Sequence, residues 1–130
     1  MQGEVICIGP ENLLGETAKI KIEGYRFVTL SCVEISETQM EILYHFDRKF
    51  QLKHLRLTVS KDTSVPSISP VYFAAFLVEN EIQDLFGIRF HGLVIDYDRT
   101  LYLEEDVKTT PFCKYVAVQK TPESNEEKAP

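Results

Sequence analysis

The chain of 130 residues lacks the sequence features by which membrane spans, cofactor sites and catalytic nucleophiles are usually recognised. Its longest apolar run covers eight residues, Val71 to Val78, whereas a membrane-spanning helix needs roughly 18–20. It contains no Gly-x-Gly-x-x-Gly or Gly-x-x-x-x-Gly-Lys loop for phosphate groups, and no Gly-x-Ser-x-Gly turn that would activate a serine. The first residues also lack the basic region and apolar core of a signal peptide. We therefore expect a cytoplasmic chain without a membrane span of its own.

Cysteine is scarce, and its spacing argues against a metal or cluster site in this chain. The three cysteines, Cys7, Cys32 and Cys113, are separated by 25 and 81 residues, whereas zinc and iron–sulfur ligands usually come in closely spaced pairs. We expect reduced thiols, with Cys7 and Cys32 as small core residues of predicted strands.

The histidines, His45, His54 and His91, are spread just as widely. His45 and His54 fall on separate predicted strands and could be neighbours in a sheet, but no cysteine or further histidine lies near them in the sequence. A role in the surface or the core is therefore favoured over metal binding. His91 follows a predicted helix and could titrate near neutral pH.

The chain has too few basic residues to favour nucleic acid as a partner. Its net charge is −6, and the acidic excess lies in residues 79–130, which hold eleven acids and six bases, against nine and eight in residues 1–78. Nucleic-acid binding proteins concentrate basic residues on one face. The charge pattern instead favours a basic protein surface as the partner.

The sequence predicts an α+β fold, with a mostly antiparallel sheet covered by two helices and an extended C-terminal arm. Three stretches rich in β-branched and aromatic residues follow one another with short turns, which indicates antiparallel pairing. Strict alternation in the third stretch assigns Leu55, Leu57 and Val59 to the core. The predicted strands cover residues 4–8, 25–35, 39–47, 52–60 and 88–90, and a hairpin from 94–96 to 100–103 is expected to turn near Asp98 and Arg99. We expect one domain over residues 1–106, an extended docking arm over 107–118 and a disordered tail over 119–130.

Two helices are predicted, one from Pro10 to a stop at Gly24 and one that ends near Phe86. Ser69 is expected to cap the second helix, with Pro70 in its first position. The first half of this helix, Val71 to Val78, is apolar on every side, so both of its faces need a cover. The sheet supplies one cover, and either the core of this chain or a partner subunit supplies the other.

Three carboxylates, Glu79, Glu81 and Asp84, lie in the C-terminal turns of this helix, where the helix dipole disfavours negative charge. We therefore expect groups outside the helix to bind them. At helical spacing the three do not converge on one point, and Glu81 with Asp84 is the best pair for acid–base chemistry. The alternatives are such an enzyme site, a solvated polar face, and an interface where the acids meet arginines or backbone amides of another chain. We favour the interface.

The same stretch, Val78 to Gly92, resembles the signature of the 30 kDa subunit family of respiratory complex I, the NADH:quinone oxidoreductase. That signature reads Glu-x-Glu-x-x-Asp-x-Phe-Gly-Ile, followed by an aromatic residue and a glycine. The family also supplies a small subunit to membrane-bound, energy-converting nickel–iron hydrogenases. Upstream, the segments Tyr44–Asp47, Leu52–Val59 and Val65–Pro70 fit the expected order, so the resemblance covers roughly residues 25 to 98.

The chain departs from the family pattern in two places. Asn80 stands where the family usually has arginine, and Leu93 to Tyr97 replaces a His-Pro-Asp-Leu-Arg-Arg run. That run is typical of the respiratory members. Its absence favours the shorter, hydrogenase-type branch of the family.

The resemblance implies a non-catalytic accessory subunit that docks on the hydrogenase-type large subunit of a membrane-bound oxidoreductase complex. It implies no cofactor in this chain; electrons would pass through iron–sulfur clusters, and in a hydrogenase a nickel–iron centre, of the large and iron–sulfur subunits. The chain would lie at the inner face of the cell membrane and touch the membrane only through its complex. Its acids would pair across the interface, the glycine would permit a tight reversal, and the two phenylalanines would anchor packing. The implied docking residues are Glu79, Glu81, Asp84, Phe86, Gly87 and Phe90. The competing hypotheses are a stand-alone carboxylate-dependent enzyme and a small regulatory or ligand-binding module that shares the fold.

Overall fold

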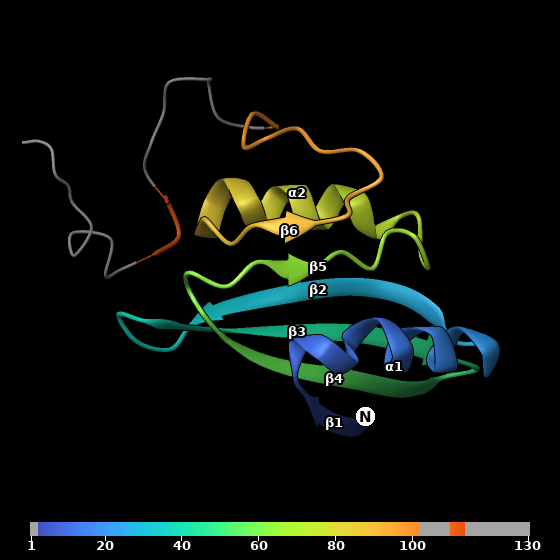
Figure 1. The fold of residues 1–130 in the computed structure, drawn as a ribbon. Helices are drawn as coiled ribbons and strands as arrows, with labels where there is room; N and C mark the ends of the chain where they lie inside the picture. Colours follow the sequence, from blue (N-terminus) through green and yellow to red (C-terminus); the bar gives the residue numbers. More distant parts are fainter. Residues whose placement is uncertain (1–2, 102–109, 114–130) are drawn as a thin grey trace, which may run out of the picture.

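Three consecutive antiparallel strands form the centre of the fold (Figure 1). The computed structural model describes residues 3–101 and 110–113. Along the chain the elements are β1 (Glu4–Ile8), α1 (Pro10–Ile22), β2 (Arg26–Glu34), β3 (Gln39–Arg48), β4 (Gln51–Ser60), β5 (Val65–Pro66), α2 (Ala75–Phe86) and β6 (Phe90–His91). The four-stranded sheet has the order β1-β4-β3-β2, with β1 parallel to β4, while β5 and β6 form a separate parallel pair. The predicted α+β fold with a mostly antiparallel sheet is confirmed.

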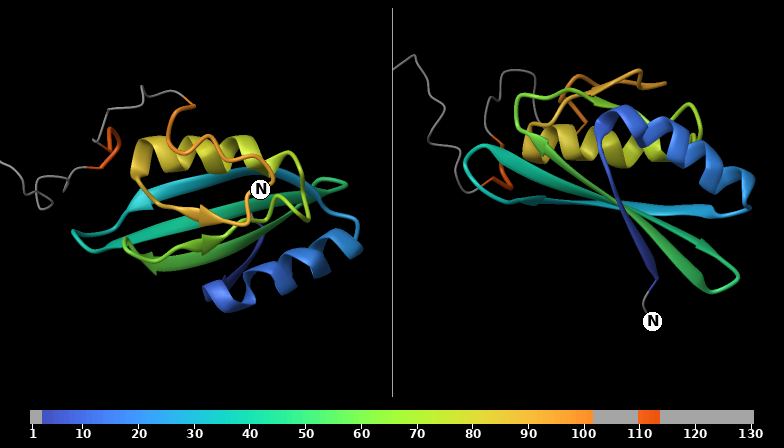
Figure 2. Two further views of the ribbon diagram at one scale, coloured as in Figure 1. Left: turned by 45° about the horizontal axis from the view of Figure 1, so that its top comes forward. Right: turned by 60° about the horizontal axis from the view of Figure 1, so that its bottom comes forward.

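Alternation along the strands places the core on one face of the sheet. Leu55, Leu57 and Val59 are at most 4% exposed, which confirms the core face predicted for this strand. On β3 the alternate residues from Met40 to Phe46 are fully buried in the same way. Both helices lie on this side of the sheet (Figure 2), so one face is covered and the other is open.

Helix α1 follows the local signals in its sequence. Pro10 occupies the first turn, where its missing N–H is not needed, and Gly24 ends the turn after the helix with a φ of 91°. The helix buries Leu13, Thr17 and Ile20. Lys21 donates a hydrogen bond of 2.7 Å to the carbonyl of Val71, which ties α1 to the loop before α2.

The second helix begins five residues later than predicted, at Ala75 rather than Pro70. The hydroxyl of Ser69 does not cap it, because this oxygen accepts a hydrogen bond of 3.0 Å from the distant amide of Val94. Instead the chain between Ile68 and Phe76 forms tight turns, such as the bond from the Val71 amide to the Ile68 carbonyl. Among the described residues, no helix is long and apolar enough to cross a membrane.

The hairpin predicted between 94 and 103 is wrong for its described part. Residues 92–101 form turns without a strand, and the amides of Val94 and Tyr97 bond to side chains of other elements. The predicted turn does occur, because Asp98 and Arg99 have positive φ values of 53° and 63°. The predicted arm and tail fall mostly outside the described residues.

Four residues of the predicted arm, 110–113, are described, and they lie against α2 of the same chain. The Phe112 amide donates a hydrogen bond of 2.8 Å to the carbonyl of Leu85, and its ring packs edge to face on Phe86 with 5.5 Å between centroids. The start of the arm thus extends the surface of α2. Whether the rest of the arm docks on a neighbour stays a prediction.

Candidate partner-binding surface

The polar residues of the motif on α2 lie on a face that is buried inside this chain. Glu79, Asn80, Gln83 and Asp84 all have no exposed surface. Buried polar groups need hydrogen-bond partners, because an unpaired one costs about 1–3 kcal/mol. The described loops on either side of the helix supply many of these partners.

Glu79 binds the loop before α2. Its carboxylate accepts hydrogen bonds of 2.6 Å from the Ser67 hydroxyl and 2.9 Å from the Ile68 amide. Burial raises the pKa of Glu79 to about 7, and the two hydrogen bonds oppose this shift. The groups expected outside the helix therefore exist, but for Glu79 they belong to the same chain.

Gln83 and Gly87 shape the reversal from α2 into β6. The Gln83 side-chain oxygen accepts a hydrogen bond of 2.9 Å from the Phe90 amide, and its nitrogen donates one of 3.2 Å to Asp96. Gly87 has a φ of 81°, and a Cβ there would lie 2.6 Å from the side chain of Thr110. Both its conformation and its surroundings therefore require glycine.

Asn80 joins the two places where the chain departs from the family pattern. Its side-chain nitrogen donates a hydrogen bond of 2.8 Å to the carbonyl of Ile95, and its oxygen accepts one of 2.8 Å from the amide of Tyr97. Both partners lie in the segment that replaces the charged run. Arg99 then donates two hydrogen bonds of 2.9 Å to the carbonyls of Gln83 and Asp84, at the last turn of α2.

Of the six predicted docking residues, Glu81 and Phe86 are partly exposed and line one surface pocket of the described chain. This pocket of about 340 Å³ lies between α2 and β2, and its walls include Leu30, Cys32 and Phe112. Glu79, Asp84 and Phe90 are at most 3% exposed. The structure does not place Glu81 and Asp84 in one pocket, so the pair needed for acid–base chemistry does not form there. Partner binding by the six residues stays a prediction.

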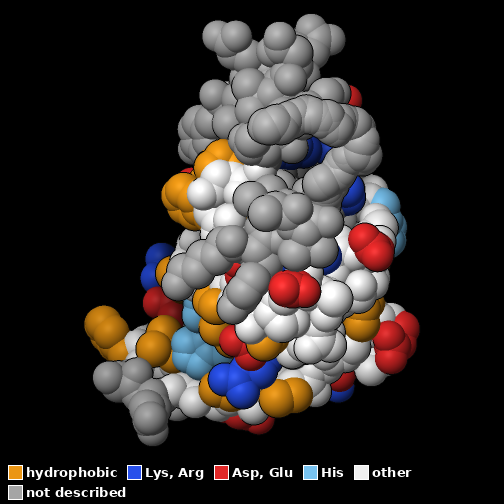
Figure 3. All heavy atoms as spheres, turned by 90° about the vertical axis from the view of Figure 1, so that its left-hand side faces the viewer, with side chains coloured by type: hydrophobic (Ala, Val, Ile, Leu, Met, Phe, Trp, Pro, Cys, Tyr) orange, Lys and Arg blue, Asp and Glu red, His pale blue; other side chains and the backbone are white. Residues whose placement is uncertain are grey.

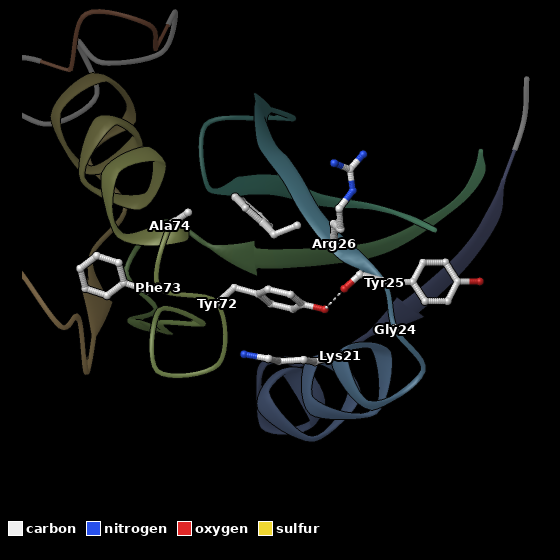
Figure 4. Close-up of a pocket in the computed structure, with 8 residues that line it drawn as sticks. Lys21, Gly24, Tyr25, Arg26, Tyr72, Phe73 and Ala74 are labelled. Atoms are coloured by element: carbon white, nitrogen blue, oxygen red, sulfur yellow. Dashed lines mark hydrogen bonds between the residues drawn. The ribbon is translucent and has the colours of Figure 1, made fainter. Parts of the chain in front are cut away.

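A second pocket, of about 450 Å³, lies at the opposite end of α2 (Figure 4). It is bordered by the end of α1, the start of β2 and the loop before α2. The Tyr72 hydroxyl donates a hydrogen bond of 2.8 Å to the Tyr25 carbonyl, and the ammonium group of Lys21 lies 5.4 Å from the centre of the Tyr72 ring. Arg26 also lines this pocket, but it forms an ion pair of 2.9 Å with Asp47.

Exposed apolar side chains lie between and beside the two pockets. Phe73 is 62% exposed and Leu77 is 47% exposed. Phe73 lies in the turn just before α2, and Leu77 lies in the first turn of the helix. The described part of the chain therefore covers the stretch from Val71 to Val78 only in part: it buries Ala75 and leaves Phe73 and Leu77 exposed. Hydrophobic side chains also reach the surface on the side that faces the left of Figure 1 (Figure 3).

The histidines lie apart from these pockets. His45 and His54 are direct neighbours across β3 and β4, as predicted, with 2.8 Å between their Nδ1 atoms. Burial and the neighbouring His54 lower the pKa of His45. Within residues 3–101 and 110–113, no group of three or more potential metal ligands occurs.

The cysteines correct one prediction. Cys7, expected in the core, is exposed, because it lies on the uncovered face of β1; Cys32 is half-buried and Cys113 is buried. Burial raises the pKa of the Cys32 thiol to about 12, so this thiol is held protonated.

Comparison with known proteins gives a consistent result. The sequence pattern of the respiratory-chain NADH dehydrogenase 30 kDa subunit matches residues 6–122. The C subunit of the NADH-quinone oxidoreductase of Ruegeria pomeroyi is 32% identical over 122 residues, which cover 82% of this chain and 61% of that protein. The corresponding C subunit from Rhodobacter capsulatus is 32% identical over 138 residues, which cover 92% of this chain and 69% of that protein.

The fold also occurs in a solved structure. It comes from the membrane-bound sulfane sulfur reductase, an archaeal respiratory membrane complex. The match has a TM-score of 0.69 at 16% identity and covers 82% of this chain and 66% of that chain. At this identity the match shows the fold alone.

Proposed function

Because this chain belongs to the respiratory-chain NADH dehydrogenase 30 kDa subunit family, we propose that it is a non-catalytic accessory subunit of a membrane-bound oxidoreductase complex. Its direct partner is the large, hydrogenase-type subunit. Electrons pass through iron–sulfur clusters of the neighbouring subunits, and this chain holds the large subunit in place. It reaches the inner face of the cell membrane only through the complex.

The observation that supports docking best is the exposed apolar surface at the start of α2. Phe73 and Leu77 are large apolar residues that the described chain leaves in contact with water, and burying such a side chain is worth about 1.5–3 kcal/mol. Glu81 lies beside them at the next helical turn and lines a pocket with Phe86. A partner that covers this side gains apolar contact and can pair a basic residue with Glu81.

The remaining predicted residues contribute from inside the chain. Glu79 forms hydrogen bonds with the loop before α2. Gly87 permits the turn after the helix, and this turn lets the Phe90 amide donate a hydrogen bond to the Gln83 side chain. In this proposal they fix the shape of the docking surface rather than contact the partner. The two linked departures at Asn80 and in residues 93–97 support a hydrogenase-type complex over an ordinary respiratory one.

The test is recovery of the tagged chain from detergent-solubilised native membranes, with mass spectrometry and metal analysis. A complex with nickel, iron and sulfide supports the hydrogenase type, and one with iron and sulfide alone supports a dehydrogenase. The Glu81→Lys variant should stay folded and lose about tenfold or more in recovered large subunit. Asp62→Lys is the matched control, because Asp62 is an exposed acid in the turn after β4.

Two outcomes contradict the proposal. Recovery of the chain alone from the soluble fraction would favour a stand-alone module. Normal recovery of the complex with Glu81→Lys would remove Glu81 from the docking surface.

A further inference from the structure

The border between α2 and β2 is a groove with one open side. Strand β2 is at the edge of the four-stranded sheet, and among the described residues it pairs only with β3. Helix α2 packs over this strand. Both pockets lie on this border: one is lined by Phe27 and Phe73, the other by Leu30 and Glu81.

The rim of this groove is apolar. Phe73 lines one pocket and Phe112 lines the other, and their side chains are 62% and 59% exposed. Leu77, one helical turn before Glu81, is 47% exposed. A rim of this kind marks a binding site more often than a solvated surface. An edge strand in addition presents unpaired backbone N–H and C=O groups that a further strand can use.

The two ends of the groove carry opposite charges. At the end near the start of β2, Lys21 is exposed and forms no ion pair with a described acid; Arg26 at the same end is neutralised by Asp47. At the other end Glu81 is half-buried, and no described residue forms a hydrogen bond or ion pair with it. A bound segment with an acidic residue near Lys21 and a basic residue near Glu81 can therefore bind in one direction along the groove.

We propose that this groove binds an extended apolar segment of a partner subunit, which adds to the edge of β2 as a further strand. The segment carries a basic residue against Glu81 and an acidic residue against Lys21. This inference rests on the proposed function and names the part of the partner that docks. Main-chain hydrogen bonds to the edge strand supply affinity, and the two pockets supply specificity.

The geometry limits the segment. Along α2, Ala74 and Glu81 are seven residues apart, which is about 10 Å of helix. An extended strand spans this distance with about three to four residues. The pairing of β2 with β3 shifts register between Phe27 and Thr29. Regular strand geometry along the free edge of β2 therefore begins at Thr29. The segment therefore pairs with residues 29–33 and carries its two charges at least about three to four residues apart.

The test uses the purified complex with a photoreactive side chain, Leu77→p-benzoylphenylalanine. Cross-linking should join position 77 to one apolar segment of a partner subunit with the stated charges. Thr58→p-benzoylphenylalanine is the control, because Thr58 is exposed on the uncovered face of the sheet. Hydrogen exchange of alternate amides in residues 29–33 should slow by about tenfold or more in the complex relative to the free chain.

Each other result overturns the inference in a recognisable way. A cross-link from position 58 and none from 77 would place the partner on the open sheet face. A cross-link from 77 to residues 114–118 of the same chain would mean that this chain fills its own groove. Unchanged exchange in residues 29–33 would exclude strand addition. All three leave the proposed function standing, whereas absence of any complex removes that function itself.

Discussion

Helix α2 departs from the usual pattern of burial, because several of its polar residues are fully buried while large apolar residues at its start are exposed. Glu79, Asn80 and Gln83 have no exposed surface, whereas Phe73, just before the helix, and Leu77, in its first turn, are about half exposed or more. A surface helix of a globular protein normally buries its apolar side and exposes its polar side. The buried polar residues bind loops of their own chain, and in our proposal the exposed apolar residues bind a partner subunit.

The largest expected effect comes from the buried side. Glu79→Ala removes the acceptor of the Ser67 hydroxyl and the Ile68 amide, so the free energy of unfolding should fall by about 2–4 kcal/mol. Urea unfolding measures this loss. Leu77→Ala is the matched control on the exposed side, and it should change the same quantity by less than about 0.5 kcal/mol. Equal losses for the two variants would show that the exposed side of α2 contributes as much to the stability of the free chain as the buried side.

The free energy of unfolding should also depend on pH, because Glu79 on the buried side of α2 has a shifted pKa. The pKa of Glu79 is raised from 4.5 to about 7 by burial, so the folded chain keeps a proton that the unfolded chain releases. The stability contributed by this group is complete below pH 4.5 and is lost as the pH rises to about 7, by up to about 3 kcal/mol.

The Glu79→Gln variant isolates this contribution, because it cannot titrate. The difference in unfolding free energy between the native chain and Glu79→Gln should change with pH between 4.5 and 7 and be flat above that range. Urea unfolding at a series of pH values measures it. A constant difference would show that the pKa of Glu79 is the same in the folded and the unfolded chain.

The smallest expected effect on stability is on the exposed side. Leu77→Ser should leave the free energy of unfolding within about 0.5 kcal/mol but reduce recovery of the partner subunit from membranes. Leu14→Ser is the control, because Leu14 is 41% exposed on α1, away from the groove. If both variants assemble normally, the apolar side of α2 has no partner.

The sheet could be predicted from the sequence because its signals are local. Alternation in residues 52–60 identified the core face, and Pro10 and Gly24 marked the ends of α1. The start of α2 could not be predicted, because Ser69 uses its hydroxyl on Val94, 25 residues away. A local capping signal gives no sign of such a competing partner.

The candidate site could be predicted only in part, for the same reason. The motif identified the helix that matters, and the run of apolar residues indicated a missing cover. The burial of Glu79 depends on Ser67 and Ile68, which lie twelve and eleven residues earlier in a loop. Charged residues are normally exposed, so the sequence alone favoured a surface position.

The link between Asn80 and residues 95–97 has a consequence for how such chains diverge. Asn80 donates to the Ile95 carbonyl and accepts from the Tyr97 amide. Arginine at position 80 alone has no acceptor for the Tyr97 amide, and it would place a larger charged group in a fully buried space. Likewise, if the charged run alone replaced residues 93–97, the backbone groups that Asn80 now binds at Ile95 and Tyr97 would belong to a different loop. We therefore expect the two positions to be energetically coupled, so that exchanging one without the other lowers the stability of the chain.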